Sequence, residues 1–300
     1  MTRPANDPMR GIFWMLITGL CFVAVTAIVK YMGQEVPPAQ AAFMRYLMGL
    51  VFLAPIARTL LRTRLTPRQW ALFSFRGLCH GFGVILWFFA MTRIPIAEVT
   101  AMNYLAPVYV SIGAALFLGE RLAARRIAAV IVALIGTAII LRPGFREVAP
   151  GHWAMLLAAV VFAGGYLTAK IMADELPASI VVAMLSVFVT ICLAPFALAV
   201  WITPTLSDLV LLFGVACFAT AGHYTMTLAF ASAPVTVTQP ITFLQLVWAT
   251  LLGVLVFAEP VDGWVILGGV VILAAVTFIT YREAQLRGQA TTPPSSAPKL

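Results

Sequence analysis

Hydrophobic residues run along this chain in long uninterrupted stretches, and short segments that hold most of the charged residues and prolines separate them. The stretches are about 17 to 25 residues long, the length at which an α-helix crosses the hydrocarbon core of a bilayer. They do not alternate in segments of about ten residues, as the strands of a membrane barrel do. The pattern therefore predicts ten spanning helices, at residues 11–29, 38–61, 70–91, 95–118, 127–141, 153–172, 177–201, 206–230, 235–257 and 263–281.

The first half of this pattern, residues 11–141, recurs in the second half, residues 151–281. The repeated pairs are Gly11 and Gly151, Phe22 and Phe162, Lys30 and Lys170, Pro37 and Pro177, then, one position closer, Gly83 and Gly222, Pro95 and Pro234, Glu120 and Glu259. Each half holds five spans, and an odd number makes the second half enter the membrane upside down. We therefore predict an all-α integral membrane protein with two inverted five-helix repeats around a central cavity, as in secondary transporters.

Composition agrees with a chain whose solvent is lipid. Hydrophobic residues make up 62% and charged residues 10%, and the mean hydropathy is +1.00, whereas soluble domains carry about 25% charge. The four cysteines lie within predicted spans, without the spacing of a metal site or a disulfide framework. We expect no metal and no cofactor, and we expect the polar, proline-rich tail at 288–300 to be disordered.

The charges report the orientation of the chain in the membrane. One set of alternate loops carries thirteen Lys and Arg residues, among them those at 58–68 and 121–126, and the other set carries four. Because cations avoid translocation, both termini are predicted to face the cytoplasm, with the protein in the inner membrane. This asymmetry accounts for the net charge of +8, and no predicted domain outside the lipid bilayer is large enough to bind nucleic acid.

Two segments carry a resemblance to a known family. The helix after Pro95 ends in Phe-Leu-Gly-Glu at 117–120, and its copy after Pro234 ends in Val-Phe-Ala-Glu-Pro at 256–260, where Ala258 departs from the usual Gly-Glu ending. With these endings the chain resembles the EamA type of the drug/metabolite transporter superfamily, and in overall look the YddG-like aromatic amino-acid exporters. The resemblance implies ten helices around a cavity, alternating access, and export of small metabolites.

Polar groups within the spans are the candidate binding residues, because such groups are costly in lipid and by default face the protein interior or a water-filled path. In the third span, His80 and Trp87 lie on one stripe, and His80 alternatively hydrogen-bonds across a packed helix pair. In the eighth span, His223 has Val84 at its repeat-equivalent position, so the repeat itself does not require a histidine there.

The fourth and ninth spans are repeat mates with polar stripes. Asn103 and Tyr104 lie on one, and Gln245 and Trp248 on the other, so an inverted pair aims them at each other near the midplane. These residues line the cavity in one reading, whereas in the other they only form hydrogen bonds between helices. Pro107, Pro195 and Pro240 are expected bending points.

Arg45 lies too deep in the second span to reach the membrane surface easily. We weigh two partners for it: Glu98 as an ion pair, or a substrate carboxylate, which a guanidinium binds with two parallel hydrogen bonds. Lys30 and Lys170, at helix ends in both halves, are expected to be structural.

The function that these features favour is export of amino acids, aromatic or otherwise apolar, or of similar small-molecule substrates. The sequence has no G-x-x-x-x-G-K-[ST] loop for ATP and no Asp or Glu near a helix centre, so transport driven by the substrate gradient is favoured over proton coupling. The alternative is a membrane enzyme acting on lipid-like substrates, but His80, His152 and His223 lie in different spans and form no catalytic cluster.

Overall fold

The computed structural model describes residues 7–118, 124–173, 175–233 and 235–290, and within these ranges the regular elements are all helices. The first repeat contains α1 (Pro8–Met32), α2 (Pro38–Gly49), the 3-10 helix η1 (Leu50–Ile56), α3 (Ala57–Arg62), α4 (Pro67–Met91), α5 (Ile96–Asn103), α6 (Ala106–Leu118) and α7 (Ala124–Leu141). The second contains α8 (Pro150–Ala173), α9 (Ala178–Ala199), α10 (Leu206–Ser232), α11 (Val235–Thr238), the 3-10 helix η2 (Gln239–Thr242), α12 (Phe243–Phe257) and α13 (Gly263–Ala290).

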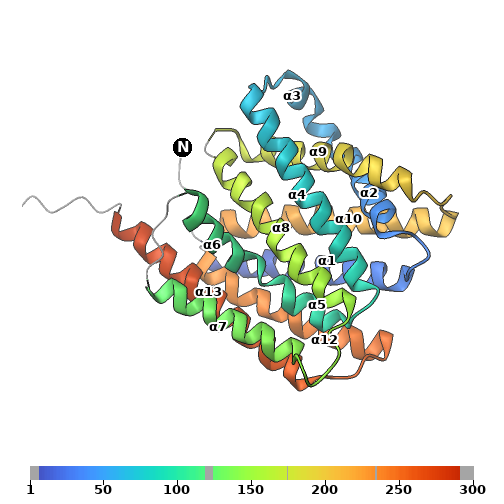
Figure 1. Ribbon diagram of the computed structural model, residues 1–300. Coiled ribbons are helices and arrows are strands. Elements are labelled where there is room, and N and C mark those ends of the chain that lie inside the picture. The colour runs from blue at the N-terminus through green and yellow to red at the C-terminus, as the bar shows by residue number, and fades with distance from the viewer. Residues whose placement is uncertain (1–6, 119–123, 174, 234, 291–300) are drawn as a thin grey trace, which may run out of the picture.

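The prediction of an all-α membrane protein is confirmed. Among the described residues, nine helical segments are long and apolar enough to cross a bilayer, and the shorter apolar helix at Leu244–Phe257 falls in the remaining predicted span. Helix α1 begins and α13 ends at the same end of the bundle (Figure 1). Helix α13 extends to Ala290, into the tail predicted to be disordered, and residues 291–300 lie outside the described part of the chain.

Three predicted spans are interrupted where a proline removes a backbone donor. The span predicted at 95–118 is broken between α5 and α6, just before Pro107, and its repeat mate at 235–257 is broken at η2, which contains Pro240. The span at 38–61 is broken at η1, which contains Pro55, whereas α9 continues through Pro195. Breaks in the two repeat-mate helices are the arrangement that transporters use at a binding site, because half-helix ends present polar groups within the membrane.

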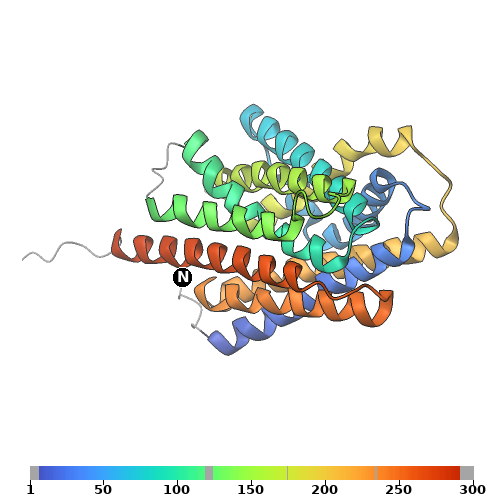
Figure 2. The same ribbon diagram turned by 60° about the horizontal axis from the view of Figure 1, so that its bottom comes forward.

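The two repeats interlock through their first and third helices (Figures 1 and 2). Helix α1 packs along α10, and α4 packs along α8, so the first helix of each repeat lies against the third helix of the other. A glycine lets the helices approach closely in both pairs. A Cβ on Gly83 would lie 2.5 Å from the Phe162 ring, and one on Gly222 would lie 3.3 Å from the Phe22 ring. These are repeat-equivalent contacts, and both phenylalanines are thereby held at the centre of the molecule.

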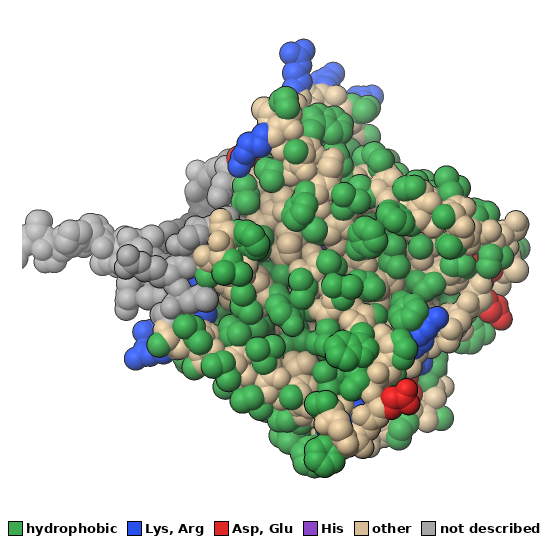
Figure 3. All heavy atoms as spheres, in the orientation of Figure 1, with side chains coloured by type: hydrophobic (Ala, Val, Ile, Leu, Met, Phe, Trp, Pro, Cys, Tyr) green, Lys and Arg blue, Asp and Glu red, His purple; other side chains and the backbone are tan. Residues whose placement is uncertain are grey.

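The outer surface suits lipid. Large hydrophobic side chains, such as Leu116 and Phe117 on α6 and Leu255 on α12, are mostly exposed. In Figure 3, hydrophobic side chains spread across the visible face while Lys and Arg side chains gather at its margins. The last helices of the two repeats, α7 and α13, lie side by side (Figure 2).

Ala258 ends α12 in a conformation that favours glycine. Its backbone is left-handed, with φ 52° and ψ 31°, and glycine is the usual residue at such a helix end. We expect Ala258→Gly to stabilise the protein by about 0.5–1 kcal/mol, which raises the thermal unfolding midpoint in detergent by about 1–3 °C. Ala138→Gly, at an exposed site within α7, is the control and should lower the midpoint. A lower midpoint for Ala258→Gly would contradict this account of the helix end.

Candidate functional site

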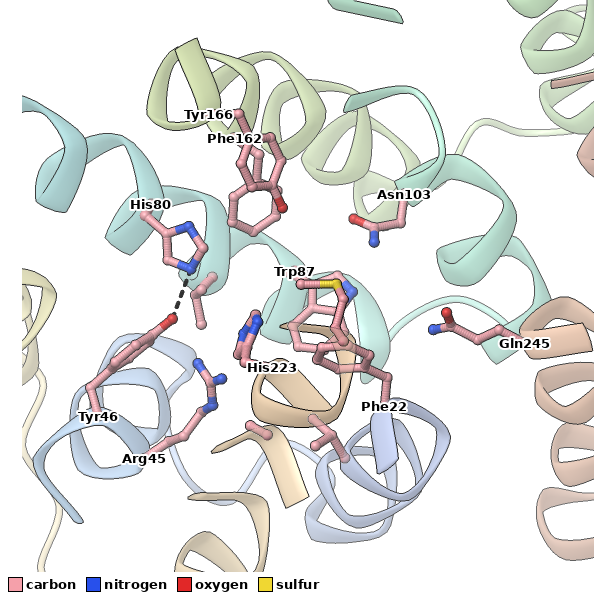
Figure 4. Close-up of a pocket in the computed structure, with 14 residues that line it drawn as sticks. Phe22, Arg45, Tyr46, His80, Trp87, Asn103, Phe162, Tyr166, His223 and Gln245 are labelled. Atoms are coloured by element: carbon pink, nitrogen blue, oxygen red, sulfur yellow. Dashed lines mark hydrogen bonds between the residues drawn. The ribbon is translucent and has the colours of Figure 1, made fainter. Parts of the chain in front are cut away.

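A cavity of about 210 Å³ lies at the centre of the molecule, lined by helices of both repeats (Figure 4). It is lined by Phe22, Val25, Arg45, Tyr46, His80, Val84, Trp87, Asn103, Phe162, Tyr166, Ala219, His223, Met226 and Gln245. The first repeat contributes residues from α1, α2, α4 and α5, and the second from α8, α10 and α12. A cavity of this kind, mostly apolar with a few polar groups, is typical of a small-molecule site.

One end of the cavity is cationic. Arg45 is 7% exposed, and its guanidinium lies 4.3 Å from the centre of the Tyr46 ring. No carboxylate among the described residues pairs with it, and its Nε has no hydrogen-bond partner. The Tyr46 hydroxyl is hydrogen-bonded to His80 Nε2 at 2.8 Å, and His223 lies beside Arg45 (Figure 4). A guanidinium in this position is available to bind an anion in the cavity.

The other end presents two amides. Asn103 is the last residue of α5, and Gln245 lies in the first turn of α12, so each stands next to a break in its span. Figure 4 shows both on the side of the cavity away from Tyr46 and Arg45. Each amide both donates and accepts hydrogen bonds, so this end can bind neutral polar groups of a ligand.

Aromatic rings form the walls between these ends. The Phe162 and Tyr166 rings are stacked with centroids 6.3 Å apart, and the Phe22 ring meets His223 edge-on at 5.2 Å. Of these aromatic residues, Trp87 is a predicted site residue, whereas Phe162 and Tyr46 were not predicted from the sequence. The internal repeat could have indicated Phe162, because it is the repeat-equivalent of Phe22.

Six of the nine predicted site residues line this cavity: Arg45, His80, Trp87, Asn103, His223 and Gln245. Tyr104 instead donates a hydrogen bond of 2.9 Å to the carbonyl of Thr242, and so joins the two broken spans. Trp248, on α12, is 37% exposed and does not line the cavity. Glu98 lies elsewhere.

The ion pair between Arg45 and Glu98 that we considered is not present. Glu98 lies in the first turn of α5 and binds Arg146 through two hydrogen bonds of 2.9 Å, and it also contacts His152 Nε2 at the start of α8. The Glu98 carboxylate raises the pKa of Arg146, which lies in the segment between the repeats. This segment has no counterpart in the repeat, so symmetry gave no indication of Arg146 as the partner.

A second polar contact joins the repeats at the same end of the bundle. Lys30, at the end of α1, lies 2.6 Å from a Glu259 oxygen and donates to the carbonyl of Ile94 at 2.9 Å. The other Glu259 oxygen accepts a hydrogen bond of 2.9 Å from the amide of Ile96 at the start of α5. Lys30 thus binds a carbonyl, as expected of a structural lysine, and it also forms an ion pair with the other repeat.

These features define a membrane transporter with two inverted five-helix repeats and a cavity between them. The chain belongs to the EamA-like transporter family, which matches residues 9–142 and 149–281. The resemblance to the EamA type of the drug/metabolite transporter superfamily is thereby confirmed. Members of this family are transporters and not enzymes, so the hypothesis of a membrane enzyme is set aside.

Similar proteins move different solutes. A Rickettsia bellii S-adenosylmethionine uptake transporter is 28% identical, with 93% of this chain and 97% of that protein covered. A Rhizobium johnstonii riboflavin transporter is 30% identical over 94% and 95%, and a Pseudomonas aeruginosa pseudopaline exporter is 25% identical over 88% and 94%. One crystal structure matches the fold with a TM-score of 0.60 at 20% identity, covering 94% of this chain and all of that one.

Glu98 should contribute strongly to stability. We expect Glu98→Ala to lower the free energy of unfolding by about 3–5 kcal/mol, because it leaves the Arg146 cation and the buried His152 without their carboxylate. Glu175→Ala is the control: Glu175 pairs with Arg68, whose side chain is 61% exposed, and such a pair contributes about 0–1 kcal/mol. Thermal unfolding in detergent measures both, and equal shifts would contradict the structural role of the Glu98 cluster.

Proposed function

We propose that this protein is a secondary transporter that exports amino acids with aromatic or other apolar side chains, or metabolites of similar build, across the inner membrane. In this proposal both termini face the cytoplasm, in accordance with the distribution of Lys and Arg over the loops. The observation that carries the proposal is Arg45, a buried guanidinium that pairs with no carboxylate among the described residues, at one end of a cavity lined by aromatic rings. A carboxylate of the substrate supplies the missing partner.

The cavity suggests how such a molecule lies. Its carboxylate binds Arg45, and its apolar body packs among Phe22, Trp87 and Phe162. Asn103 and Gln245 bind polar groups at the far end. Export as the direction rests on the resemblance to amino-acid exporters, since the named relatives include both an uptake transporter and an exporter.

The source of energy in this proposal is the gradient of the substrate. Proton coupling generally uses an acid in the transport path, and no Asp or Glu is among the described residues that line the cavity. Of the two histidines there, His80 is buried and His223 is half-buried, and both lie near the cation Arg45, so a further positive charge on either is electrostatically unfavourable.

Counterflow in proteoliposomes tests this function. Vesicles loaded with unlabelled L-phenylalanine should accumulate labelled L-phenylalanine transiently, and protein-free vesicles should not. Labelled riboflavin and S-adenosylmethionine, run in parallel, test the solutes for which two relatives are named. Exchange of either of these without exchange of any carboxylate with an apolar body would overturn the proposal.

A further inference from the structure

The charges around the central cavity are unbalanced. Among the described residues, its lining contains one guanidinium, two imidazoles and two amides, and no Asp or Glu. Within the described part of the chain, Glu98 and Glu259 are engaged at the end of the bundle with Arg146 and Lys30. The described lining therefore offers a cation for a negative group and no acidic side chain for a positive group.

This matters for an amino acid, because its ammonium and carboxylate are attached to the same carbon atom. When the carboxylate binds Arg45, the ammonium lies within a few ångströms of the same guanidinium. The neighbours at that end are His223, His80 and Tyr46, and the Tyr46 hydroxyl already bonds His80. An ammonium buried there is repelled by the like charge of Arg45. It also loses its hydration without pairing with a carboxylate among the described residues, which adds a second unfavourable contribution.

We infer that the site recognises the carboxylate and the apolar body of its cargo but not an ammonium. This inference rests on the proposed function and selects, of the two substrate classes named there, the metabolites of similar build over the amino acids themselves. The preferred cargo is a monocarboxylate anion with an aromatic or other apolar body and without a free amino group, as in 2-hydroxy, 2-oxo or N-acyl acids. A hydroxyl, oxo or amide group in place of the ammonium removes the repulsion from Arg45 and is satisfied by neutral hydrogen bonds.

Competition among three related compounds tests the inference. L-phenyllactate differs from L-phenylalanine by a hydroxyl in place of the ammonium, and phenethylamine lacks the carboxylate. Each competes at pH 7.5 for exchange of labelled L-phenylalanine and of labelled L-phenyllactate in proteoliposomes. Phenyllactate should inhibit half-maximally at a concentration at least tenfold lower than phenylalanine does, and phenethylamine should not inhibit.

The outcomes separate this inference from the proposed function. If phenylalanine exchanges and competes as well as phenyllactate or better, the inference is wrong and the proposed function stands. If neither label exchanges, while the protein elutes as a folded species from a sizing column, the proposed function itself fails.

An acidic variant gives a second measurement. Asn103→Asp keeps the size of the side chain and adds a negative charge to the cavity, and Asn103→Ser is the neutral control. We expect the Asp variant to raise the half-maximal concentration of phenyllactate at least tenfold more than the Ser variant does. The Asp variant should raise the half-maximal concentration of phenylalanine less than that of phenyllactate. Equal losses for the two compounds would overturn the inference.

Discussion

Replacing Arg45 with methionine should raise the cargo concentration for half-maximal exchange by at least about a hundredfold, a loss of about 2.7 kcal/mol in binding free energy. Among the described residues that line the cavity, Arg45 is the one Lys or Arg. A carboxylate paired with it gains two charge-assisted hydrogen bonds, which are the strong kind. Arg45→Lys keeps the charge but loses the planar fork, so we expect a smaller loss of about tenfold.

The same substitution should stabilise the empty protein. Arg45 is buried and has no carboxylate partner among the residues that the structure describes, and removing an uncompensated buried charge relieves its desolvation cost. Binding and stability are therefore expected to change in opposite directions. Exchange measured over a range of cargo concentrations reports the change in binding. Thermal unfolding without cargo reports the change in stability.

Arg76 provides the matched control for Arg45. It is equally buried, on α4, but it donates a hydrogen bond of 2.9 Å to the carbonyl of Val181 and does not line the cavity. Arg76→Met should leave the half-maximal cargo concentration within about threefold of the parent, because Arg76 does not line the cavity. If Arg45→Met bound cargo like the parent, the carboxylate would have to bind elsewhere and the proposed pose would be wrong.

The sequence predicted those parts of the site that stand out against an apolar background. His80, Asn103, His223 and Gln245 were found because a polar side chain within a span needs an interior partner. Aromatic side chains give no such contrast, since they also occur in packing and at membrane interfaces, and Tyr46 was therefore missed. The partner of Glu98 was missed because a loop residue such as Arg146 has no helical period or repeat that fixes its position.

Breaks in the helices were only partly visible in the sequence. The prolines at 107, 195 and 240 occur in equally apolar surroundings, yet α9 continues through Pro195 while the other two mark ends of helices. Whether a proline bends or ends a helix depends on what satisfies the freed carbonyl, which the surrounding helices decide. Hydrophobic patterning alone does not contain that information.

Repeat-equivalent positions in the two halves line the same cavity with chemically different side chains. Three repeat-equivalent pairs on α4 and α10 line the cavity, namely His80 with Ala219, Val84 with His223, and Trp87 with Met226. The backbone positions that face the cavity are thus shared by both repeats, while the side chains differ. Symmetry of the repeats serves alternating access, and asymmetry of the side chains leaves room for a ligand with two unlike ends.

Breaking the contact between Lys30 and Glu259 should slow exchange at least about tenfold. The pair joins the end of α1 to the segment after α12. Lys30 also donates a hydrogen bond to the carbonyl of Ile94, and Glu259 accepts one from the amide of Ile96. With side chains only 18% and 11% exposed, each single removal leaves a largely buried charge and costs about 3 kcal/mol in the closed arrangement of this end. Lys30→Met should therefore favour states in which this end is open, and a transporter held open at one end completes fewer cycles.

Spin labels at Tyr31 and Val261, exposed residues beside the pair, can report the opening as a longer distance between the labels in Lys30→Met.

The double variant Lys30→Met with Glu259→Met should recover part of the lost stability, because it leaves no unpaired charge. Exchanging the two charges should not restore function, since a glutamate at 30 would face the carbonyl of Ile94 and a lysine at 259 would face the amide of Ile96. Arg68→Met, which breaks an exposed pair, is the control and should exchange like the parent. If the charge exchange restored transport, the backbone contacts would be unimportant and the pair would act through its charges alone.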